Sequence, residues 1–216
     1  MDIIQVLSFC GLGILLVNTI LYSLGLAGSS KAYKSFFYYL LFLFIVQAAV
    51  EIHAMQSLNN HYLSTYYLLF NFLLLSFFFY YLFRHIKKSV ARLIKYATPA
   101  IITGLAIQYA FKPHLYFEFN SIGFLITSAF IIVYSVLYLF ELISNKIPYT
   151  YVIAGMLIYY ISSSLIFASA TSIVSFDNEV NMVIWKINAV LFIIYQLLIL
   201  REWIQTFYRK TQARGQ

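Results

Sequence analysis

The stretch Tyr62–Phe83 reads YLSTYYLLFNFLLLSFFFYYLF, and the segment Arg84–Lys95 directly after it reads RHIKKSVARLIK. The first stretch contains no Asp, Glu, Lys, Arg or His, and as a helix it is long enough to cross a hydrocarbon core of about 30 Å. The second stretch contains five basic residues within two or three helical turns. An apolar span followed at once by a basic run is typical of a transmembrane helix that ends at a cytoplasmic surface.

The rest of the chain repeats this pattern of apolar spans separated by short polar connections. The composition is 62% hydrophobic and only 10% charged, whereas soluble domains carry about 25% charged residues. We therefore predict an all-α polytopic membrane protein, a bundle of seven transmembrane helices formed by residues 1–204, with a short basic tail at 205–216. The predicted spans are Ile4–Leu26, Phe36–Gln56, Tyr62–Phe83, Leu93–Phe111, Glu118–Leu142, Pro148–Thr171 and Asn181–Leu200.

The distribution of basic residues predicts the orientation of the bundle. All but two of the 14 Lys and Arg residues lie in the odd-numbered connections or in the C-terminal tail. The loop after the sixth span is acidic instead, with Asp177 and Glu179. Because basic loops stay on the cytoplasmic side, the N-terminus is predicted outside and the C-terminus inside. We expect a bacterial inner (cytoplasmic) membrane as the location.

The same distribution explains the net charge of +7 without nucleic acid. Basic residues at a cytoplasmic boundary meet anionic lipid headgroups, with about 1 kcal/mol available for each Lys or Arg. We therefore expect membrane lipids as partners and no nucleic acid. The basic run is predicted to contact lipid or a protein partner through Arg84, Lys87, Lys88, Arg92 and Lys95.

Polar side chains inside the spans form the candidate site. Polar groups in a bilayer face the bundle interior, and the helical rise of about 1.5 Å per residue puts polar groups from five of the seven spans at a similar depth. This layer predicts either an outward-opening ligand cavity or interhelical hydrogen-bond contacts; both readings stay open. Its members are Gln47, Glu51, Asn71, Thr127, Ser162 and Asn188.

Two ionisable residues need separate treatment. Glu51 is the one carboxylate predicted well inside a span, so it is either protonated, paired or hydrated, and it is a functional candidate. Lys186 lies at nearly the same depth in the last span. It is expected to reach the outer headgroups, to pair with Glu51, or to act as a chromophore lysine, and its helical face looks lipid-facing.

No motif in the sequence indicates a cofactor, a metal site or a soluble enzyme. His53 and His61 do not have a metal-ligand spacing. The chain has no nucleophile elbow, no glycine-rich phosphate loop and no metalloprotease helix. We therefore expect no cofactor and no metal, and an enzyme is the less favoured alternative.

Two segments carry a resemblance: Tyr151–Ala168, YVIAGMLIYYISSSLIFA, and Ile184–Trp203, IWKINAVLFIIYQLLILREW. They resemble a family of small, uncharacterised seven-helix membrane proteins of Bacteroidota, often encoded near sensor kinases or response regulators. The resemblance implies a seven-helix fold but no activity or active-site residues.

Three functions follow as hypotheses. The first is a sensory or ligand-binding module, in which the polar layer binds a ligand and a separate partner reads the change. The second is an intramembrane enzyme or transporter for a lipid or small solute, with Glu51 as an acid, base or proton carrier. The third is a structural subunit of a membrane complex.

Overall fold

The computed structural model describes the backbone of residues 3–56, 58, 60–144, 147–173 and 178–208; it describes their side chains except at 144, 167–173, 178–181 and 206–208. Within these ranges the predicted all-α fold is confirmed. The seven helices are α1 (Ile3–Leu24), α2 (Lys31–Met55), α3 (His61–Ile86), α4 (Lys88–Phe111), α5 (Ser121–Ser144), α6 (Thr150–Ile173) and α7 (Asn178–Glu202). A short 3-10 helix, η1 (Pro113–Tyr116), follows α4, and a π-helical segment, η2 (Trp203–Tyr208), continues α7.

Most of these helices have the length and composition of membrane spans. Among the described residues, six helices are long and apolar enough to cross a bilayer, and the described part of α6 adds a shorter apolar segment, Thr150–Ile166. The chain is therefore a helical integral membrane protein. The predicted tail lies partly in η2, and residues 209–216 lie outside the described residues.

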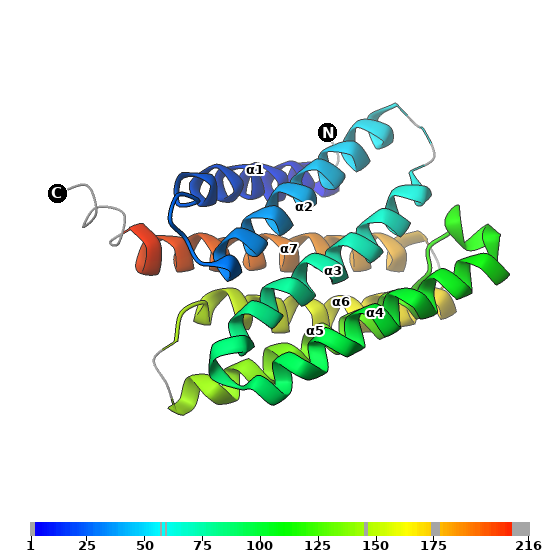
Figure 1. Cartoon of the computed structure of the whole chain (residues 1–216). Coiled ribbons are helices and arrows are strands. Elements are labelled where there is room, and N and C mark those ends of the chain that lie inside the picture. Colours follow the sequence, from blue (N-terminus) through cyan, green and yellow to red (C-terminus); the bar gives the residue numbers. More distant parts are fainter. Residues whose placement is uncertain (1–2, 57, 59, 145–146, 174–177, 209–216) are drawn as a thin grey trace. The chain divides into compact units, whose positions relative to one another are not determined.

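The helices form two compact units, and α5 contributes to both. The first unit comprises Met1–Ala27 and Ser128–Gln216, and the second comprises Gly28–Thr127. Within the second unit, α2 packs against α3 and α3 against α4 as consecutive antiparallel hairpins (Figure 1). Within the first, α7 packs against both α1 and α6.

Helix ends in the second unit extend beyond the predicted apolar spans. α2 begins at Lys31 rather than Phe36, because the Ser30 side chain accepts a hydrogen bond from the Tyr33 N–H at 3.2 Å and caps the helix. α4 begins at Lys88 rather than Leu93, and Lys87 alone links it to α3. Lys and Arg are good helix formers, so the basic run that was predicted as a connection is almost entirely helical.

α5, in contrast, begins later than predicted, at Ser121 rather than Glu118. The Asn120 side-chain oxygen accepts a hydrogen bond from the Gly123 N–H at 2.9 Å, which satisfies a backbone donor of the first helical turn. The Asn120 amide also exchanges hydrogen bonds with Gln108 near the end of α4, at 3.0 and 3.3 Å. One side chain therefore caps α5 and joins it to α4.

In the first unit, both α1 and α6 pack against α7. It runs parallel to α1, where Asn18 donates to the Gln196 main-chain oxygen at 2.8 Å and to its side-chain oxygen at 3.0 Å. Both side chains are 0% exposed. α7 runs antiparallel to α6, where the Tyr159 and Tyr195 rings stack with centroids 5.5 Å apart. Small-residue packing and interhelical hydrogen bonds are the forces that hold membrane helices together.

The contact between Asn18 and Gln196 leads to a prediction about α1. Asn18→Leu removes both hydrogen bonds, whereas Gln196→Leu leaves the bond to the main-chain oxygen. We expect Asn18→Leu to lower the free energy of unfolding by about 1–2 kcal/mol and Gln196→Leu by about half as much. Unfolding in mixed micelles by SDS titration measures both variants and their double mutant. Equal losses for the two single variants would contradict the role of the main-chain bond.

Candidate functional site

The predicted polar layer has members in both units, and those in the second unit differ in burial. Asn71 of α3 is buried, while Gln47 and Glu51 of α2 are half-buried. The Thr127 hydroxyl lies within hydrogen-bond distance of two carbonyls of its own helix, Gly123 at 3.0 Å and Phe124 at 3.1 Å. Its hydroxyl hydrogen is thus satisfied locally, which is common for Thr inside a helix.

In the first unit, a serine next to the predicted Ser162 makes the hydrogen bond between α6 and α7. Ser163 is fully buried and donates to the Asn188 side-chain oxygen at 3.0 Å, joining α6 to α7. Ser162, the residue chosen from the sequence, is half-buried and lies about 100° away around the helix. Three consecutive serines, Ser162, Ser163 and Ser164, made the choice ambiguous; the third bonds to the Ile161 carbonyl of its own helix.

Lys186 is half-buried on α7. Its predicted pairing with Glu51 would join the two units, so it stays a prediction. Among the described residues, no group of three or more His, Cys, Asp or Glu side chains has a geometry that could hold a metal ion.

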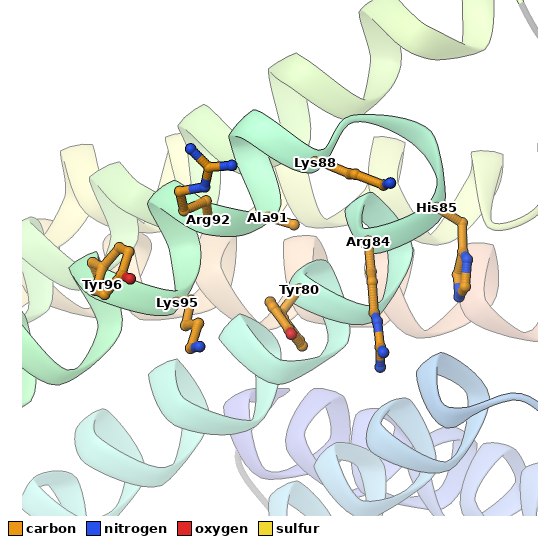
Figure 2. Close-up of a pocket in the computed structure, with 8 residues that line it drawn as sticks. All are labelled: Tyr80, Arg84, His85, Lys88, Ala91, Arg92, Lys95 and Tyr96. Atoms are coloured by element: carbon orange, nitrogen blue, oxygen red, sulfur yellow. The ribbon is translucent and has the colours of Figure 1, made fainter.

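A groove on the α3–α4 hairpin of the second unit, which we call the basic groove, is shown in Figure 2. It has a volume of about 440 Å³ and none of its lining residues is acidic. Four of the five basic residues predicted as a contact surface lie in it; Lys87, in the link, does not. The lining residues are Tyr80, Arg84, His85, Lys88, Ala91, Arg92, Lys95 and Tyr96.

Helical spacing and the one-residue link explain why these residues line one groove. Lys88, Arg92 and Lys95 follow one another at intervals of four and three residues on α4, so they share a face. Arg84 follows Tyr80 by four residues on α3, and Figure 2 shows both extending to the same side as Lys95. Ala91, which is buried, lines the groove between these charged side chains.

The electrostatics of the basic groove favour an anionic ligand. Two arginines and two lysines line one concave surface, where like charges repel each other. Arg84, Lys88, Arg92 and Lys95 are all exposed, so each retains free donors for a carboxylate or phosphate. Arg84 and Arg92 can each bind such a group through two parallel hydrogen bonds.

The opposite end of the second unit has an aromatic cluster around Tyr116 of η1. Its hydroxyl lies 2.6 Å from that of Tyr66, and the two rings meet edge to face. The hydrogen bond with Tyr66 and, to a lesser extent, desolvation raise the pKa of Tyr116 above its usual value of 10.0. Nearby, His53 donates from Nδ1 to the Ala49 carbonyl at 2.8 Å, so in the neutral imidazole Nε2 accepts from the Tyr62 hydroxyl at 2.9 Å.

The first unit contains a buried carboxylate that the sequence analysis did not select. Glu202, at the end of α7, is 1% exposed and accepts backbone N–H bonds from Tyr149 at 2.7 Å and Tyr151 at 2.9 Å. These donors belong to the start of α6, where a negative charge is stabilised by the helix dipole. Arg201 lies over the Tyr151 ring, 4.8 Å from its centroid. We call Glu202 and the two residues whose N–H groups it binds, Tyr149 and Tyr151, the α6–α7 clamp.

The clamp also holds the turn that leads into α6. Tyr149 has a φ of 72°, a left-handed conformation that is uncommon for a non-glycine residue. Its ring is buried, and the Pro148 carbonyl before it accepts a hydrogen bond from the Tyr138 hydroxyl at 2.8 Å. This cluster is structural: its donors and acceptors are used within the protein, whereas those of the basic groove are open.

Comparisons with known proteins add no assignment. No family model, curated protein or solved structure matches the chain. The resemblance to small seven-helix proteins stays a prediction, and function has to be argued from the sites themselves.

Proposed function

We propose that the chain is a sensory or ligand-binding module of the bacterial inner membrane that signals through a separate protein, and that the basic groove receives an acidic segment of this partner. The observation that carries the proposal is the groove itself: about 440 Å³, four cations and no acidic lining residue. The positive-inside rule places this surface on the cytoplasmic side, where a signalling partner is accessible.

The shape of the groove favours a protein segment over a single ion. Its cations are spread over two helices, from Arg84 on α3 to Lys95 on α4, with Tyr80 and Tyr96 between and beside them. Several carboxylates on one segment can be bound at once by such a surface, and tyrosine rings supply apolar contact at low entropic cost. Rim charges of this kind accelerate encounter with an oppositely charged partner.

α3 provides the route from the membrane interior to the groove. Buried Asn71 lies 13 residues before Arg84 on the same helix, which corresponds to about 20 Å along the helix axis. A ligand that binds the polar layer and favours one position of α3 therefore moves one wall of the groove. Such a switch requires different affinities for the two bundle states.

The test uses a photo-crosslinking phenylalanine analogue at Tyr96, which is an exposed aromatic position on the groove rim. In native membranes we expect a protein adduct that is lost in Arg84→Gln/Lys88→Gln/Arg92→Gln. The identified partner, once purified, should bind this triple variant roughly 10- to 100-fold more weakly than the parent protein, because each of the three exposed charge pairs contributes about 0.5–1 kcal/mol.

Two controls distinguish the loss of charge in the groove from misfolding of the variant. Lys88→Arg/Lys95→Arg preserves the charge of the groove and should retain the adduct, and Lys112→Gln removes a charge at the other end of α4. An adduct that consists only of lipid, or a protein adduct that survives the triple substitution, overturns the proposal.

A further inference from the structure

A second groove of the second unit lies between α2 and α3 and has a different character. Its volume is about 290 Å³. From α2 it is lined by Lys31, Lys34, Ser35 and Tyr38, and from α3 by Leu74, Phe77 and Tyr81. On α2, Lys34 and Ser35 each lie three or four residues from both Lys31 and Tyr38, and the α3 residues follow one another at intervals of three and four, so each helix contributes one continuous stripe.

The groove has charged residues at one end and mainly aromatic and aliphatic residues at the other. Because α2 and α3 are antiparallel, the start of the α2 stripe lies beside the end of the α3 stripe. Lys31 therefore meets Tyr81, with its Nζ atom 6.0 Å from the ring centroid. Tyr38 and Leu74 each lie seven residues further into their helices, which is about 10 Å deeper in the membrane.

The deeper part of the groove is open to the bilayer. Tyr38 is 55% exposed and Phe77 is 44% exposed, so two large aromatic side chains form its walls without being covered. The shallow part has two exposed lysines, and none of the groove's lining residues is acidic. A molecule complementary to both parts has a negative head and an apolar chain.

We infer that this groove binds one anionic glycerophospholipid, with its phosphate between Lys31 and Lys34 and one acyl chain along Tyr38, Phe77 and Leu74. A free phosphate would use only the lysine end. A transmembrane helix of another protein would cover the apolar walls but would leave the two charges without an anion. The inference is independent of the proposed partner, because it concerns other residues and another helix pair.

The charges make the site selective among lipids. Compared with a zwitterionic headgroup, the net negative charge of phosphatidylglycerol interacts favourably with both Lys31 and Lys34. Each lysine near an anionic surface contributes roughly a five-fold preference, so the pair is expected to favour phosphatidylglycerol over phosphatidylcholine by about 30-fold.

The experiment is native mass spectrometry of the full chain in mild detergent, with phosphatidylglycerol and phosphatidylcholine of identical acyl chains. We expect one phosphatidylglycerol to be retained with about 30-fold preference. Lys31→Gln/Lys34→Gln should bring the preference close to parity, whereas Lys31→Arg/Lys34→Arg should keep it. Tyr38→Ala/Phe77→Ala should weaken retention of both lipids, since the walls of the groove are lost.

A matched control tests whether the groove or merely the net charge is responsible. Lys112→Gln/Arg201→Gln removes the same charge from outside the groove and should leave the preference unchanged. An equal loss in this control overturns the inference, as does unchanged preference in Lys31→Gln/Lys34→Gln. Displacement of the lipid by inorganic phosphate at equal concentration also overturns it, because the site would then recognise the phosphate alone.

Discussion

Glu202→Ala is expected to lower the free energy of unfolding by about 3 kcal/mol and the apparent melting temperature by roughly 6–12 °C. The substitution leaves the N–H groups of Tyr149 and Tyr151 without their carboxylate oxygens. An unsatisfied buried donor costs about 1–3 kcal/mol. Thermal unfolding in detergent, followed by size-exclusion chromatography of the heated samples, measures the change.

Glu202→Gln tests the contribution of the negative charge, because glutamine has nearly the same shape as glutamate but is neutral. The amide keeps one oxygen acceptor but turns an NH₂ donor toward the second backbone N–H, so we expect about half to two-thirds of the loss in Glu202→Ala. Arg201→Gln, the neighbouring exposed residue, is the control and should change stability by less than about 1 kcal/mol. If Glu202→Ala melts like the parent protein, the clamp does not hold α6 on α7.

Gly155→Leu is expected to prevent α6 from packing on α7. A Cβ atom at Gly155 would lie 2.9 Å from the Tyr195 ring and 3.2 Å from Leu198. The ring cannot move aside easily, because it is 1% exposed and stacked on Tyr159. Gly155→Ala should therefore already cost about 1–3 kcal/mol, and the larger leucine should remove most of the monodisperse protein from a size-exclusion profile.

Gly104→Ala is the matched control. Gly104 is an exposed helical glycine of α4, and a Cβ atom there meets nothing within 4 Å. Replacing it with alanine should leave stability unchanged or raise it by up to about 1 kcal/mol, because glycine is the poorer helix former. Equal effects at both positions would mean that helix propensity, rather than the α6–α7 contact, determines the result.

The helices could be predicted from the sequence because each needs its own apolar stretch to lie in a bilayer. Tyr62–Phe83 defines α3 without reference to any other part of the chain. Helix ends were less predictable, since hydropathy marks where the hydrocarbon ends and not where the helix ends. Lys31 and Lys88 begin their helices well outside the apolar stretches, because polar residues with good helix propensity continue a helix into the headgroup region.

The basic groove and the α6–α7 contacts depend on which distant residues lie next to each other. The pattern of a single sequence says little about such contacts. The basic residues of the groove could be identified, but their arrangement required the one-residue link at Lys87. Glu202 could not be selected from the sequence, since nothing in its own neighbourhood shows that Tyr149 lies beside it. Ser163 and Ser162 are adjacent and chemically identical, so only the orientation of α6 distinguishes them.

The shared position of α7 has a consequence for biosynthesis. Asn18 and its partner Gln196 are separated by 178 residues, which a ribosome takes roughly 10–35 s to translate at 5–20 residues per second. During that interval α1 exists without the α7 carbonyl that accepts from its buried Asn18 amide. The N–H groups at the start of α6 likewise lack Glu202 until α7 is made. A nascent chain that stalls before α7 therefore leaves polar donors of both α1 and α6 without these acceptors.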